Sequence, residues 1–83
     1  MATIPGFERI TVEPGKMGGQ PCIRGLRLTV KRVLRILATY DSRDEIRREF
    51  PELEDEDIRQ ALDFAAASLD DEIVDLVGQP TAG

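Results

Sequence analysis

The 83-residue sequence contains no histidine and no tryptophan, and its only cysteine is Cys22. Without histidine, the chain offers neither a Cys/His zinc site nor a Ser–His or Cys–His nucleophile pair. A single cysteine forms no internal disulfide, which agrees with a reducing compartment. One tyrosine and three phenylalanines are too few for a surface that stacks single-stranded bases. We therefore expect no catalytic site, no metal site and no cofactor.

Long apolar runs are also missing. No segment has the length and apolar character that a membrane span requires. The first ten residues, MATIPGFERI, lack the basic and apolar parts of a secretion signal. We expect a cytoplasmic protein with no membrane partner, folded as a single domain over residues 1–83.

Charge is divided unevenly along the chain. Residues 1–48 carry ten Lys/Arg and five Asp/Glu, whereas residues 49–83 carry one Arg and eleven Asp/Glu. The balances of +5 and −10 add up to the net charge of −5. A basic half suits phosphate or an acidic surface, and an acidic half suits a basic partner. A solvated surface on a small acidic protein explains the same pattern equally well.

Short β segments are expected over residues 8–28. Residues 8–12 predict one strand, and residues 20–23 and 26–28 predict two more on either side of Arg24-Gly25. Arginine tolerates a positive φ poorly, so we expect a turn that places the positive φ on Gly25 alone. In this apolar strand context, Cys22 is better explained as a small buried side chain than as a reactive thiol.

A helical core is expected over residues 29–66. Thr29 is a suitable N-cap for a first helix, whose apolar stripe runs to a helix end near Tyr40 and consists of Val30, Val33, Leu34 and Leu37. Ser42 and Glu45 form the capping box of a second helix, and Pro51 ends that helix.

A third helix is predicted to begin near Asp55. The acidic residues at 54–57 suit the positive end of the helix dipole. Its apolar stripe consists of Ile58, Ala61, Leu62, Ala65 and Leu69. Residues 67–83 are expected to form a C-terminal helix and tail. Either the stripe continues through Ile73 and Leu76 to Gly78, or Ser68 and Asp71 cap a separate short helix.

The second helix, the turn at Pro51 and the third helix together suggest a helix-turn-helix. In that arrangement the third helix enters the major groove of DNA, where Arg59 and Gln60 would read base edges. The acidic residues around them would repel phosphate. Better phosphate contacts are the basic residues of the first two helices, Lys31, Arg32, Arg35, Arg43, Arg47 and Arg48. The same layout is explained equally well by the packing of a three-helix core, without any role in DNA binding.

Two motifs place the sequence near a known family. The first is G-x-P-x-I-R-G-x-R, formed by Gly19, Pro21, Ile23, Arg24, Gly25 and Arg27. The second is S-x-x-E-I-x-x-x-F-P, which starts at Ser42. Over residues 10–65 the chain resembles the domain-of-unknown-function 433 family. The resemblance implies a mainly α fold: a three-helix, homeodomain-like helix-turn-helix core with a short N-terminal β-hairpin and a C-terminal helical extension.

The same resemblance implies a function. Many members are described as antitoxins, so we expect a non-enzymatic, homodimeric, antitoxin-like regulatory protein that binds a PIN-like ribonuclease toxin and operator DNA. The expected partner contacts are Arg24, Arg27, Leu69, Ile73 and Leu76, although Arg24 and Arg27 could instead support the hairpin. Two alternatives stay open: a stand-alone DNA-binding transcriptional regulator, and a structural dimerisation module that binds no nucleic acid. Glu54 departs from the family, which has Thr or Ser as the N-cap there, and we expect a weaker helix start.

Overall fold

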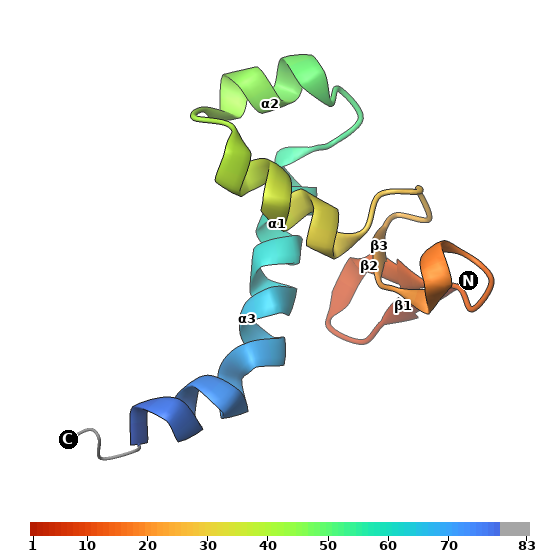
Figure 1. Ribbon diagram of the computed structural model, residues 1–83. Coiled ribbons are helices and arrows are strands. Elements are labelled where there is room, and N and C mark those ends of the chain that lie inside the picture. Colours follow the sequence, from red (N-terminus) through yellow and green to blue (C-terminus); the bar gives the residue numbers. More distant parts are fainter. Residues whose placement is uncertain (79–83) are drawn as a thin grey trace.

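The fold comprises a small sheet and three helices, described by a computed structural model with the backbone of residues 1–78 and the side chains of residues 1–69 (Figure 1). The elements are β1 (Ala2–Ile4), β2 (Phe7–Val12), the 3-10 turn η1 (Met17–Gly19), β3 (Cys22–Ile23), α1 (Val30–Thr39), α2 (Arg43–Glu49) and α3 (Asp55–Gly78). The predicted tail beyond Gly78 lies outside the described residues, as do the side chains of Ile73 and Leu76. In the described part of the chain, no helix combines the length and apolarity needed to cross a membrane.

The sheet is antiparallel and has the order β1-β2-β3. The central strand β2 agrees with the strand predicted at residues 8–12. It pairs through Ile10 and Thr11 with Ile23 and Cys22 of β3. The edge strand β1 was not predicted, although the Pro5-Gly6 turn that precedes β2 was a readable signal.

The hairpin predicted within residues 20–28 is only partly correct. Residues 26–28 form no strand, and β3 takes β2 as its ladder partner instead. What remains of the hairpin is a bridge between Cys22 and Thr29 and the bond that the Ile23 amide donates to Leu28 O at 2.9 Å. The reason is chain length, because Thr29 already caps the next helix.

Local capping signals fix the starts of α1 and α2. The Thr29 hydroxyl accepts from the Arg32 amide at 3.0 Å, and the Ser42 hydroxyl accepts from the Glu45 amide at 3.2 Å. Glu45 Oε1 reaches back and accepts from the Asp41 amide at 3.1 Å. These contacts confirm the two predicted N-caps.

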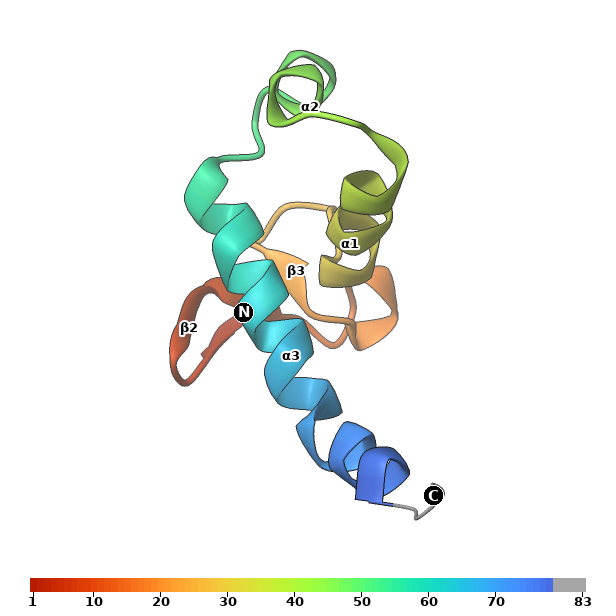
Figure 2. The same cartoon turned by 90° about the vertical axis from the view of Figure 1, so that its left-hand side faces the viewer.

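The third helix begins at Asp55 as predicted and continues without a break to Gly78, so the single-helix alternative is correct. It packs against α1 and against β2. Both views show its C-terminal part running past the rest of the domain (Figures 1 and 2). The core lies where the sheet and the helices meet and is formed by Ile10, Ile23, Val30, Val33, Ile36, Ile46, Leu53, Ile58 and Ala61.

Candidate functional site

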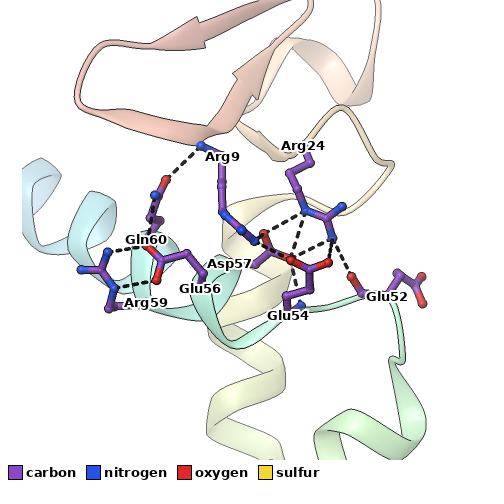
Figure 3. A network of polar contacts seen from close by, with 8 residues as sticks. All are labelled: Arg9, Arg24, Glu52, Glu54, Glu56, Asp57, Arg59 and Gln60. Atoms are coloured by element: carbon purple, nitrogen blue, oxygen red, sulfur yellow. Dashed lines mark hydrogen bonds and ion pairs between the residues drawn. The ribbon is translucent and has the colours of Figure 1, made fainter.

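A buried carboxylate lies where the sheet, the turn after β3 and the start of α3 meet (Figure 3). The side chain of Asp57 is 0% exposed. Arg24 donates to it from Nε to Oδ1 at 3.0 Å and from Nη2 to Oδ2 at 2.9 Å. Arg9 donates from Nη1 to Oδ1 at 3.0 Å and pairs with Glu54 at 2.7 Å. We call Arg9, Arg24, Glu54 and Asp57 the Asp57 cluster.

Hydrogen bonds stabilise the charge of Asp57 although the group is buried. Burial alone raises the pKa of a carboxyl group, because it disfavours the charged form. Against that effect, donors from Arg24, from the Glu54 amide at 2.9 Å and from Arg9 hold the pKa of Asp57 below its usual value. The bond to Asp57 likewise raises the pKa of Arg24. Asp57 and Arg24 therefore both carry their charge at neutral pH, and their ion pair holds the turn after β3 against the start of α3.

The Asp57 cluster also explains an unexpected turn. The amide of Leu26 donates to Ile23 O at 2.7 Å, and both central residues have positive φ, +44° at Arg24 and +72° at Gly25. Positive φ at both positions is the signature of a type I′ turn. The prediction was right for Gly25 and wrong for Arg24. The guanidinium of Arg24, bonded to Asp57 and at 2.7 Å to Glu52 O, holds the residue in this unfavourable conformation.

Two side chains that were expected to read DNA bases are occupied within the protein. Gln60 is only 7% exposed, accepts from the Arg9 amide at 2.9 Å and donates to Glu56 at 3.3 Å. Arg59 is exposed but pairs with Glu56 and with Asp63. The bond to Glu56 raises the pKa of Arg59, and the bond from Arg59 lowers the pKa of Glu56. Both side chains are therefore engaged in contacts within the protein.

Two of the arginines on α2 are also paired. Arg47 contacts Asp44 at 2.8 Å and Asp55 at 3.0 Å, and Arg43 lies 3.9 Å from Asp55. The two pairs with Asp55 join α2 to the first turn of α3. The third, Arg48, is exposed and has no ion pair within the described residues.

Four cations at the start and outer face of α1 have no acidic partner within residues 1–69. Arg27, Lys31, Arg32 and Arg35 are all exposed, and none takes part in an ion pair of that region. Arg32 borders three shallow hollows. The first is also lined by Arg27, the second by Arg35, and the third by both Lys31 and Arg35. The four residues thus form one surface, which we call the α1 basic surface.

An open apolar groove is lined by residues of α1, of α3 and of the segment before β3. Leu69, which was expected to contact a partner, lies at this groove and is 48% exposed. Of the groove residues, Leu34 and Phe64 were not expected to contact a partner. Phe64 could have been found from its helical spacing to Ala61, three residues before it. The full lining is Gln20, Pro21, Val30, Lys31, Leu34, Phe64, Ala65, Ser68 and Leu69.

The described residues hold no recognisable chemistry of a metal site. Nowhere among them do three Cys, Asp or Glu side chains gather in a way that could bind an ion. Cys22 is 2% exposed, and burial raises the pKa of its thiol, which disfavours the reactive thiolate.

Comparison with known proteins gives a family and no individual relative. No curated protein and no solved structure matches the chain at a significant level. The profile of one family, described as "Protein of unknown function (DUF433)", matches residues 10–65. The matched segment starts in β2 and ends within α3, so it includes the α1 basic surface and three of the four residues of the Asp57 cluster, Arg24, Glu54 and Asp57. Because it covers more than half of the sequence, the chain belongs to the DUF433 family.

Proposed function

We propose that this protein is a non-enzymatic, antitoxin-like regulatory protein whose protein partner is a PIN-like ribonuclease toxin and whose second ligand is operator DNA. The observation that carries the proposal is the apolar groove between α1 and α3, which lies next to the part of α3 that runs past the domain (Figure 1). A groove of this kind suits an amphipathic helix of a partner.

The chemistry of the groove supports a protein ligand. Leu34, Phe64 and Leu69 offer apolar contacts, and Lys31 and Ser68 give the border polar groups. A central apolar patch with a polar border is the usual make-up of a protein interface.

The charge of α3 supports a basic partner. After Leu69 the sequence adds four acidic residues and no basic one, namely Asp70, Asp71, Glu72 and Asp75. A ribonuclease must attract RNA phosphates and so carries basic surface near its substrate. Opposite charges steer two proteins together and select against wrong partners.

The layout of the helices supports the DNA part of the proposal. The short α2, the turn at Pro51 and the longer α3 follow one another as in a helix-turn-helix, and we include a homeodomain-like arrangement and a homodimer in the proposal. A stand-alone DNA-binding regulator is the second candidate. It is favoured by the cations of the α1 basic surface, which have no acidic partner within residues 1–69.

Co-expression with the product of the adjacent gene tests toxin binding. We expect a stable complex that Leu69→Glu in the groove disrupts. Leu62→Glu is the matched control, because Leu62 lies on the same helix with a similar exposure of 43% but does not line the groove. Circular dichroism confirms that both variants fold. The proposal fails if the parent forms no complex, or if the two variants weaken the complex equally.

A further inference from the structure

We infer that the α1 basic surface, and not the start of α3, is where this protein holds duplex DNA, by contacts to the phosphate backbone. The inference rests on the DNA half of the proposed function and is independent of the toxin half. It also contradicts the usual helix-turn-helix mode, in which the third helix enters the major groove.

The start of α3 is unsuited to approach DNA. Its first turn carries Asp55, Glu56 and Asp57, and Glu54 precedes it. The two side chains that could read bases there, Arg59 and Gln60, are bonded to acidic groups or buried. The carboxylates of this helix start are paired with arginines of the protein itself, such as Asp55 with Arg47 and Glu56 with Arg59. Within the described residues, the start of α3 therefore offers no unpaired cation to a phosphate.

The first helix has the opposite charge arrangement. Cations are favoured at the end of a helix and acids at its beginning. The second helix follows this rule, with Asp44 and Glu45 in the first turn and Arg47 and Arg48 in the last. The first turn of α1 has no acid and instead holds Lys31 and Arg32, and its last turn has no base. These cations oppose helix stability and lack partners among the described residues, so a ligand outside the chain explains them better.

The spacing of the cations suits a row of phosphates. Lys31 and Arg35 are four residues apart and Arg32 and Arg35 three apart, so each lies beside the next on the helix surface, about 5–6 Å away between Cβ atoms. Arg27 extends the row beyond the start of α1. Each strand of duplex DNA offers one charge per about 3.4 Å of axis, which lets the four cations reach neighbouring phosphates.

Aromatic geometry favours duplex over single-stranded DNA. Single-strand binding relies on exposed rings that stack on bases. The aromatic rings near the surface, Tyr40 and Phe50, are half-buried and pack edge to face against each other at 5.8 Å. Among the residues that line the three hollows of the α1 basic surface, Glu52 is the one acidic residue.

The salt dependence of binding is the quantity that tests the inference. With four phosphate contacts, log Kobs should fall with log [salt] at a slope of about −3.6, and each lost contact should reduce that slope by about 0.9. The probe is a fluorescein-labelled 30-base-pair duplex of mixed sequence, titrated by fluorescence anisotropy between 25 and 200 mM NaCl.

Three proteins are compared: the parent, the triple variant Lys31→Gln/Arg32→Gln/Arg35→Gln, and Arg59→Gln. We expect the triple variant to bind far more weakly with a slope near about −0.9, because one contact of four remains. Arg59→Gln tests the competing mode and is expected to match the parent. Glutamine keeps a high helix propensity, and circular dichroism confirms that the variants fold.

Two outcomes overturn the inference. If the triple variant binds like the parent, the α1 basic surface does not hold the DNA. If Arg59→Gln loses as much affinity as the triple variant, the start of α3 takes part in holding it. In either case only the inference fails. If the parent itself does not bind the duplex at 25 mM NaCl, the DNA half of the proposed function fails with it. Toxin binding is decided separately by the Leu69→Glu experiment.

Discussion

Arg24 and Asp57 lie 33 residues apart, yet the guanidinium of one meets both carboxylate oxygens of the other. The pair joins the turn after β3 to the first turn of α3. It also accounts for two unusual features at once, a fully buried carboxylate and an arginine with a positive φ. Each feature is unfavourable alone, and each makes the other possible.

Loss of the buried charge should strongly destabilise the fold. We expect Asp57→Asn to lower the free energy of unfolding by about 3–5 kcal/mol, because two arginines lose their ionised partner. Urea denaturation followed by circular dichroism measures the change. Asp63→Asn is the control: Asp63 pairs with Arg59 at the surface, and its loss should change stability little. Equal effects of the two substitutions would contradict the role given to Asp57.

Protonation of Asp57 at acid pH should lower the stability of the fold. The pKa of Asp57 in the folded state lies below that of the unfolded chain, about 3.9. The folded state therefore gains stability from this group above that value and loses it as the pH falls through the folded pKa. We expect the urea midpoint to drop steeply between about pH 5 and pH 2. Asp57→Asn should show a shallower drop, and an unchanged steepness would count against the assignment.

Replacing Arg24 by glycine should destabilise the fold less than replacing it by alanine. Both substitutions remove the guanidinium, but alanine keeps the cost of a positive φ, about 1–2 kcal/mol for a residue with a Cβ. We therefore expect Arg24→Gly to be more stable than Arg24→Ala by about 1 kcal/mol, the reverse of the order in an extended strand. Thermal and urea unfolding of the two variants decide the sign. An alanine variant more stable than the glycine variant would refute the type I′ turn.

Position 25 needs a residue that accepts the left-handed region. Gly25 has a φ of +72°, and a Cβ there would meet Met1 Sδ at 2.8 Å. The methionine end is flexible, so the backbone conformation sets the cost. We expect Gly25→Val to lose about 1–2 kcal/mol and Gly25→Asn less, since asparagine adopts this region more readily. Equal urea midpoints for both variants would show that the turn tolerates any residue.

The thiol of Cys22 should not react with thiol reagents while the protein is folded. Cys22 lies in β3, is 2% exposed, and burial raises the pKa of its thiol. We expect an aromatic disulfide reagent to modify it only when the chain opens, so that the rate follows the unfolding equilibrium as urea is added. A fast reaction in the absence of urea would mean that the thiol is accessible.

Local signals in the sequence were sufficient to predict the helix boundaries. The hydroxyls of Thr29 and Ser42 cap their helices, and Pro51 ends the second one, because each of these effects acts within one turn of the chain. The start of α3 was also correct. Glu54 makes no side-chain cap there, but Asp57 accepts its amide proton and so supplies half of a capping box from within the helix.

Long-range pairing made the face of α3 hard to predict. Apolar spacing put Leu62 among the core-facing residues, yet it is 43% exposed. The helix instead turns Asp57 and Gln60 inward, because both meet Arg9 on β2. Polar residues in a core are stable only beside their partners, and a sequence pattern does not show which partners are near. The acidic run at residues 54–57 therefore looked uniform, although one of its members is buried and the others are not.

The separation of Arg9 from Asp57, 48 residues, has a consequence for the order in which the chain assembles. The first two helices need only their own neighbours, so they can form early. The sheet and the start of α3 are joined only after a long loop has closed, which costs entropy before any bond is gained. We therefore expect the ionic contacts between Arg9 and Asp57 to form after the first two helices.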